Sequence, residues 1–248
     1  MLETFVALLL AHLIGDFALQ PDWMAQRKRE PGILVVHVGV HVAMTALILG
    51  VLAPLPLAVI ATTHFAIDLA KARLFRRTPQ PLSHFIADQA AHLTVLVAVA
   101  LAFPALAAAS LWPPLLPPEA AAHWSAAIAI AAGIIVAFSA GRYAVTILLA
   151  DLGLPAGPAE ADDALARGGL WIGRLERLLV FALVLVQQFT AIGMLIAAKS
   201  ILRFNSDAGA DAKARRQSEY VIIGTLMSVG WALGAGLLTA AALRHLAP

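Results

Sequence analysis

The chain has 248 residues, of which 61% are hydrophobic and only 13% are charged. An ordinary soluble domain has about 25% charged residues, so this composition excludes a typical soluble protein and indicates a polytopic membrane protein. The mean hydropathy of +0.85 agrees with that class. The net charge of only +2 gives no reason to expect nucleic-acid binding, and the lack of cysteine excludes disulfides and thiolate metal ligands.

Seven hydrophobic segments are candidates for crossing a membrane, which takes about 20 apolar residues. They lie at residues 2–20, 32–53, 56–74, 83–109, 122–150, 171–202 and 218–244. The first has no basic n-region and contains Glu3, His12 and Asp16, so we expect it to be retained and not cleaved as a signal peptide. The sequence therefore predicts an all-α polytopic membrane protein with about seven transmembrane or re-entrant helices.

The connections between these segments divide the chain. Pro54 and Pro56 predict a tight turn between the second and third segments, and the proline-rich stretch 104–118 predicts a loop at the membrane surface. We expect a four-helix membrane bundle over residues 1–110 and about three further membrane helices over 111–248. A polar, acidic stretch near 151–169 is expected to be an exposed loop that can include one short helix.

Basic residues indicate the orientation. Lysine and arginine cluster at 27–29 and 71–77, whereas the connections around Pro54 and from Pro104 to His123 contain neither residue. Because cytoplasmic loops are enriched in cations, the two basic connections are expected to be cytoplasmic and the N-terminus to face outward.

Each of the first four segments carries two metal-capable side chains one helical turn apart. The pairs are His12/Asp16, His37/His41, His64/Asp68 and Asp88/His92. Residues i and i+4 share a helix face, and ionisable groups inside a membrane are costly and mostly functional. In the predicted orientation all four pairs lie about one to two turns inside the cytoplasmic boundary. The pattern predicts an antiparallel four-helix bundle that binds one or two divalent ions, with zinc, manganese and iron as candidates.

Two interpretations without a metal compete with this one. The histidines and aspartates could form a buried hydrogen-bond network that only holds the bundle together. Alternatively, they could form a proton relay, because chains of such residues carry protons in pumps and transporters.

The segment 171–202 differs from the first four. Polar residues near Gln187 interrupt it, and a helix that crossed once would place its C-terminal cations outside, so we expect a broken or re-entrant helix. Four basic residues near its ends are candidates for binding an anionic head group: Arg174, Arg177, Lys199 and Arg203. The alternative is that they are ordinary cations at helix ends.

Five short runs of residues occur together in this chain: AHLIGDF at 11–17, DQAAH at 88–92, IGRLER at 172–177, IAAKS at 196–200 and EYVIIGTL at 219–226. In these runs the chain resembles the bacterial membrane proteins of domain of unknown function 3307. The resemblance implies a multi-pass protein of the bacterial inner membrane and no particular activity. By analogy, the His/Asp-bearing helices are also similar to those of membrane-bound proteins described as metal-dependent hydrolases.

These observations lead to one functional hypothesis and two alternatives. The leading hypothesis is an integral-membrane metal-dependent hydrolase that acts on a lipid phosphate or phosphodiester near the cytoplasmic leaflet, with Asp16, Asp68 and Asp88 as candidate catalytic carboxylates. The first alternative is a transporter of divalent cations or one coupled to protons, and the second is a scaffold with a structural polar cluster. The expected partner is membrane lipid, and a homo-oligomer is left open.

Overall fold

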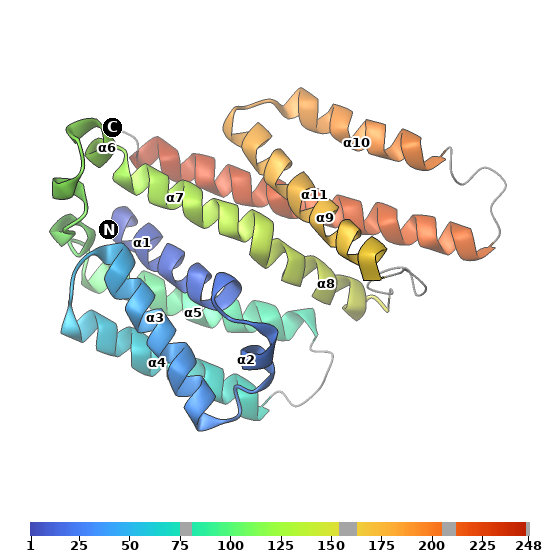
Figure 1. Cartoon of the computed structure of the whole chain (residues 1–248). Helices are drawn as coiled ribbons and strands as arrows, with labels where there is room; N and C mark the ends of the chain where they lie inside the picture. The colour runs from blue at the N-terminus through green and yellow to red at the C-terminus, as the bar shows by residue number, and fades with distance from the viewer. Residues whose placement is uncertain (75–80, 154–162, 205–211, 247–248) are drawn as a thin grey trace. The chain divides into compact units, whose positions relative to one another are not determined.

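A computed structural model describes residues 1–74, 81–153, 163–204 and 212–246, with the side chains at 163–167, 202–204 and 212–221 left undescribed. Every regular element in these residues is a helix, which confirms the all-α prediction (Figure 1). The chain divides into two compact units. Unit 1 comprises residues 1–135 and 241–248, and unit 2 comprises residues 136–240.

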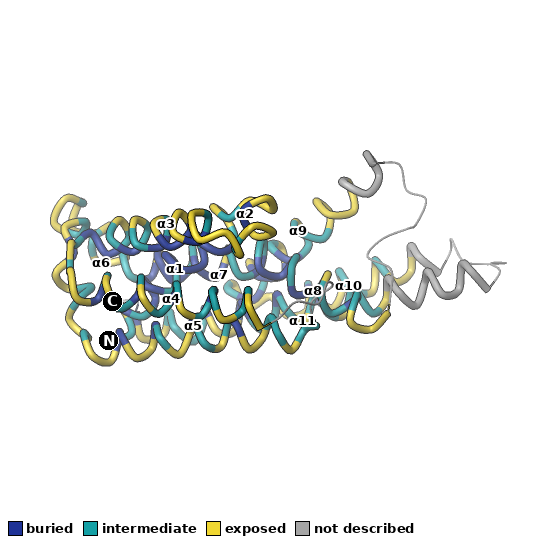
Figure 2. Tube along the Cα trace, turned by 90° about the horizontal axis from the view of Figure 1, so that it is seen from below, coloured by how far each residue is buried: buried dark blue, intermediate teal, exposed yellow. Residues whose placement is uncertain are grey.

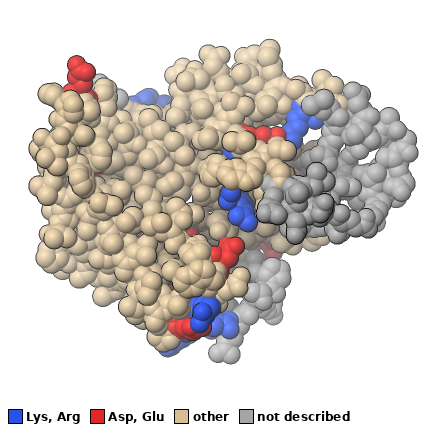
Figure 3. Space-filling view, viewed as in Figure 1, with Lys and Arg blue, Asp and Glu red and all other residues tan. Residues whose placement is uncertain are grey.

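Five helical stretches among the described residues are long and apolar enough to cross a membrane. They are α3 (Pro31–Leu49), α4 (Pro54–Leu74), α5 (Leu82–Ala102), the run Trp124–Asp151, and Ile222–Leu246 within α11 (Ala212–Leu246). On the face shown in Figure 3, charged side chains occupy only a few places. Exposed Val35, Val36 and Leu101 lie on these helices, as expected for surfaces in contact with lipid. The polytopic membrane class is therefore supported by both length and surface.

Unit 1 contains a closed ring of four helices. Helix α1 (Leu2–Leu13) contacts α3 and α5, and α4 contacts α3 and α5 on the other side (Figure 1). Helix α7 (Trp124–Ile135) packs against the remaining face of α1, so α1 is among the most buried helices of the unit (Figure 2). Small residues such as Ala7 and Ala129 are buried and allow the helix backbones to approach closely.

The end of α3 is fixed by a glycine and a tryptophan. Gly50 has a left-handed φ of 62° and ends the helix, and its Cα faces the ring of Trp112. The indole Nε1 of Trp112 donates a hydrogen bond of 2.6 Å to the carbonyl oxygen of Leu47, one of the last carbonyls of α3. The proline-rich stretch thus folds back onto the bundle.

Two local predictions need correction. Pro54 and Pro56 lie in the first turn of α4 and not in the connecting turn, because a proline lacks only an N–H that the first turn does not use. Helix α5 ends at Ala102 and not near residue 109, since Pro104 follows it closely. Short helical turns at Ala107–Ala109 and Pro113–Leu115 and helix α6 (Pro118–Ala122) then lead to α7.

Unit 2 holds the broken segment. Helices α9 (Asp163–Leu185) and α10 (Phe189–Phe204) meet at Gln187, whose φ of 58° is left-handed, so the expected break near this residue is present. Val180, Val184 and Ile192 form a buried core across the break. Helix α9 begins at Asp163, inside the stretch expected to be a loop; residues 154–162 lie outside the described residues.

Candidate metal centre

All eight predicted side chains meet inside the four-helix ring of unit 1. Two come from each of the four segments, and none of the residues is more than 9% exposed. They are His12 on α1, Asp16 on the following π-helix η1 (Ile14–Ala18), His37 and His41 on α3, His64 and Asp68 on α4, and Asp88 and His92 on α5. The repeated spacing has therefore placed eight metal-capable groups in one buried cluster.

The π-helix brings Asp16 and its neighbour Gly15 against α3. π-helical turns inside α-helices are frequent at functional sites because they shift the direction of the side chains that follow. A Cβ atom added to Gly15 would lie 2.6 Å from Nε2 and 2.7 Å from Nδ1 of His41. Only glycine at this position lets the imidazole of His41 reach the Asp16 carboxylate.

The cluster is built in layers along the bundle axis. The first layer contains three carboxylates and one imidazole, from Asp16, His37, Asp68 and Asp88. One turn further along each helix lies a layer of four imidazoles, from His12, His41, His64 and His92, whose neighbouring ring centroids are 3.7 to 5.4 Å apart. A third layer of Leu8, Thr45, Ile60 and Leu96 covers the imidazoles.

Two carboxylates face histidines on both of their oxygens. Oδ1 of Asp16 lies 3.2 Å from Nε2 of His37 and from Nε2 of His41, and its Oδ2 lies 3.5 Å from Nε2 of His12. Oδ2 of Asp68 lies 3.3 Å from Nε2 of His37, and its Oδ1 lies 3.8 Å from Nε2 of His92. Both aspartates therefore have the arrangement of a carboxylate that could bridge two ions.

These separations suit ligands around a metal ion. Four ligands at 2.0–2.1 Å from a tetrahedral zinc ion are about 3.3 Å from one another, whereas direct hydrogen bonds are usually 2.7–3.2 Å long. Most of the histidine-to-carboxylate separations lie between 3.2 and 3.8 Å. The groups are close enough to share an ion and mostly too far apart for good hydrogen bonds.

Several buried polar atoms of the cluster have no hydrogen-bond partner in the protein. They are Nε2 of His12, Nδ1 of His37, Nε2 of His92 and Oδ1 of Asp88. A buried polar atom left without a partner costs about 1–3 kcal/mol, so a purely structural network would be poorly satisfied here. The donor set and these orphaned atoms together fit a divalent cation.

One known family is similar to the first part of the chain. The sequence profile of the family described as Protein of unknown function (DUF3307) matches residues 4–113. The chain resembles that family over these residues. The match contains all eight cluster residues and confirms the resemblance over this part of the chain, whereas the runs at 172–177, 196–200 and 219–226 lie outside it. No curated protein and no solved structure matches the chain.

Three polar side chains of the DUF3307 region were not expected at the cluster. Nζ of Lys28 lies 2.8 Å from Oδ2 of Asp68, and Nζ of Lys71 lies 2.6 Å from Oδ2 of Asp88. The amide nitrogen of Gln89 lies 3.3 Å from a carboxylate oxygen of Asp16 and of Asp88. Sequence reasoning treated the two lysines as orientation signals only. The spacing of Lys71, three residues after Asp68, was the one local hint that it shares that helix face.

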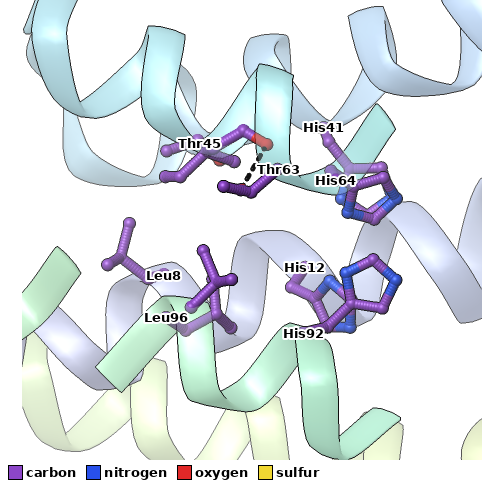
Figure 4. A pocket seen from close by; sticks show the side chains of 10 residues that line it. Leu8, His12, His41, Thr45, Thr63, His64, His92 and Leu96 are labelled. Atoms are coloured by element: carbon purple, nitrogen blue, oxygen red, sulfur yellow. Dashed lines mark hydrogen bonds between the residues drawn. The ribbon is translucent and has the colours of Figure 1, made fainter. Parts of the chain in front are cut away.

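A small cavity of about 10 Å³ lies between the histidine layer and the third layer, which is about the space of one water molecule. In Figure 4 the rings of His12, His41, His64 and His92 gather at one end of it, and Leu8, Leu96, Thr45 and Thr63 line the other. The lysine side of the cluster is more open, since the side chain of Lys71 is 24% exposed and that of Lys28 is 13% exposed. The cluster is thus better sealed on its apolar side than on its lysine side.

The predicted head-group residues lie in unit 2. Arg177 is buried and donates hydrogen bonds to the carbonyl oxygens of Ala137 at 2.8 Å and Phe138 at 3.4 Å, and to Oγ of Ser228 at 3.2 Å. Ala137 and Phe138 belong to the π-helix η4 (Val136–Ala140), in which carbonyls lose their usual α-helical partners. These contacts give Arg177 a structural role inside unit 2.

The other three basic residues have fewer internal contacts. The guanidinium of Arg174 lies over the ring of Trp171 at 5.3 Å, and Nζ of Lys199 lies 2.6 Å from a carboxylate oxygen of Glu176. The side chain of Arg203 lies outside the described residues. Binding of an anionic head group by these residues stays a prediction.

Proposed function

We propose that the chain is an integral-membrane metal-dependent hydrolase that acts on a lipid phosphate or phosphodiester, with a dinuclear centre in unit 1. The observation that carries the proposal is the convergence of five histidines and three aspartates within the four-helix ring. Zinc, manganese and iron are all compatible with these nitrogen and oxygen donors. When bound, a divalent ion would activate a water molecule and polarise a phosphoryl oxygen.

The charge of the cluster favours an anionic substrate. With neutral imidazoles, three carboxylates face two ammonium groups, from Lys28 and Lys71, which leaves one uncompensated negative charge. Two divalent ions would reverse this to three positive charges in a buried site. Uncompensated buried charge is expensive, so the loaded centre should attract anions such as the oxygens of a phosphate group.

The protein side chains would orient the metal ligands and remove a proton from the attacking water molecule. Lys28 and Lys71 each bind one carboxylate at hydrogen-bond distance and fix its direction, as outer partners of metal ligands commonly do. A carboxylate oxygen of Asp16, Asp68 or Asp88 that does not bind an ion would serve as general base. A lipid head group would approach from the lysine side, where the cluster is more exposed.

The sealed apolar layer favours an enzyme over a transporter. Alternating access requires a path from the binding site to both faces of the membrane, and Leu8, Ile60 and Leu96 close one side of the histidine layer. A catalytic centre needs access from one side only. The unpartnered polar atoms argue in the same way against a purely structural cluster.

The first test is the metal content of the detergent-purified protein, measured by inductively coupled plasma mass spectrometry. We expect one or two equivalents of zinc, manganese or iron. The triple variant with His12→Ala, His37→Ala and His64→Ala should lose them, whereas His123→Ala, an exposed histidine at the end of α6, should not. Absence of metal in the unmodified protein, even after ions are added back, would refute the proposal.

The second test is catalysis by the metal-loaded protein in mixed micelles. Phosphatidic acid as a phosphomonoester and phosphatidylglycerol as a phosphodiester are the probes, with released phosphate or head group as the signal. Hydrolysis of either probe that disappears in Asp68→Ala supports the hydrolase. If metal binds, neither lipid is cleaved and divalent ions cross the membrane of reconstituted liposomes, the transporter alternative replaces it.

A further inference from the structure

Seven of the eight cluster residues form two groups that share no residue, and a third group of His12, His64 and His92 overlaps both of them. In one group, Oδ1 of Asp16 meets nitrogens of His37, His41 and His64, and the four ligand atoms all lie within 4.8 Å of one another. In the other group, a nitrogen of His92 meets oxygens of Asp68 and Asp88 within the same distance. The first group offers four ligands dominated by nitrogen, and the second offers three dominated by oxygen.

We propose that these groups are two different metal sites, a closed site and an open site, and that only the open site exchanges its ion and binds the anionic substrate. The closed site is Asp16, His37, His41 and His64, and the open site is Asp68, Asp88 and His92. The proposal rests on the metal centre of the proposed function and adds a division of labour within it.

The closed site has what a tightly bound zinc-like ion needs. Four protein ligands complete a tetrahedron and leave no position for water, which is the usual arrangement of structural zinc sites. Oδ1 of Asp16 is 3.2 Å from Nε2 of both His37 and His41, close to the separation of about 3.3 Å expected around such an ion. His37 and His41 are at most 1% exposed, so an ion bound there would be shielded from solvent.

The open site is incomplete, with three protein ligands against four in the closed site. Nε2 of His92 lies 3.7 Å from Oδ1 of Asp88 and 3.8 Å from Oδ1 of Asp68. Three protein ligands leave at least one coordination position for water or a phosphoryl oxygen, as catalytic sites do. Two carboxylates suit an oxygen-preferring ion such as manganese or magnesium better than three imidazoles do.

Lys71 positions the carboxylate of Asp88 as a ligand of the open site. Nζ of Lys71 donates a hydrogen bond of 2.6 Å to Oδ2 of Asp88. Oδ1 of the same carboxylate is buried and has no hydrogen-bond partner in the protein. Nε2 of His92 is also buried and unpartnered. The two orphaned atoms are therefore the ones that the open site would use as ligands, and they lie next to the more exposed lysine side of the cluster.

Asp68 connects the sites, because its Oδ2 lies 3.3 Å from Nε2 of His37 in the closed site whereas its Oδ1 faces His92 in the open site. Removal of Asp68 should therefore weaken both ions. Removal of Asp88 should weaken only one, since all its metal-facing contacts are with the open site. This difference separates two metal sites from a single diffuse cluster.

The experiment compares metal retention in the full-length protein and in two single variants. Each protein is loaded with zinc and manganese, dialysed briefly against EDTA, and analysed by mass spectrometry, with competition titrations of each metal alone. We expect the unmodified protein to keep one equivalent and lose the other. Asp88→Ala should keep the retained ion and show no second site, whereas His41→Ala should lower the affinity of the retained ion by about 10–100-fold or more.

Two controls keep the outcomes separate. His123→Ala should behave like the unmodified protein, and His41→Gln replaces His41→Ala if gel filtration shows that the latter does not fold. Loss of both ions in a single step, or equal effects of the two variants on both ions, would overturn the two-site assignment. If the ions separate as expected but no lipid is hydrolysed, the two-site assignment stands and the hydrolase proposal fails.

Discussion

Gly15→Ala is the most direct test of the cluster geometry, because it adds one carbon atom at its most crowded point. The new Cβ would lie 2.6 Å from Nε2 and 2.7 Å from Nδ1 of His41, whereas ordinary carbon contacts are about 3.5–4.0 Å. The imidazole must therefore move by about 1 Å. Metal–ligand distances tolerate only about 0.2 Å, so His41 would cease to be a ligand.

The expected effect is a loss of zinc affinity of at least 10–100-fold, which corresponds to about 1.4–2.7 kcal/mol. Competition with a fluorescent zinc chelator in detergent measures this directly. Gly39→Ala is the matched control, because Gly39 lies on the same helix as His41 and a Cβ there meets nothing within 4 Å. Gly39→Ala should leave zinc affinity unchanged. If Gly15→Ala also left it unchanged within about threefold, His41 could not be a ligand in the position described.

Three further predictions concern the two units separately. Metal affinity should fall as the pH is lowered from neutral, since an imidazole must be neutral to bind a metal; titration of metal release between neutral and acidic pH checks the sign. Arg177→Ala should lower stability by about 1–3 kcal/mol because Ala137 and Ser228 lose a buried donor, while metal content stays unchanged; unfolding in detergent and elemental analysis measure the two effects. Trp112→Phe should cost about 0.5–1.5 kcal/mol through the lost hydrogen bond to Leu47, with unaltered metal content, as the same two assays would record.

The cluster could be predicted from the sequence because the two residues of each pair are only four positions apart. A spacing of four residues on each of four helices determines that His12 and Asp16, or Asp88 and His92, share a face. Membrane topology then places the pairs at one depth, because alternate helices run in opposite directions. The apolar third layer follows from the same periodicity, one turn beyond the histidines.

The lysines at the cluster could not be predicted in the same way. Lys28 is 40 residues from Asp68 and lies in a connection between helices, so its contact depends on how the chain turns after α1. A short helix, α2 (Asp22–Gln26), carries the chain to that point, and no periodic pattern specifies its direction. Charge counting alone therefore assigned Lys28 to the membrane topology and missed its contact with the site.

The π-helices η1 and η4, both within the described part of the chain, serve a similar purpose that the sequence does not indicate. In unit 1, η1 presents Asp16 and the bare backbone of Gly15 to His41; in unit 2, η4 offers the carbonyl oxygen of Ala137 to the guanidinium of Arg177. In each unit a π-helical turn lies where a buried ionisable side chain needs a closer approach than a regular helix gives. Because the inserted residue changes neither hydropathy nor spacing detectably, its position has to be found in three dimensions. A helix with a regular hydrophobic pattern can therefore contain a π-helical turn that the pattern does not indicate. In this chain the site depends on Gly15, which lies in such a turn.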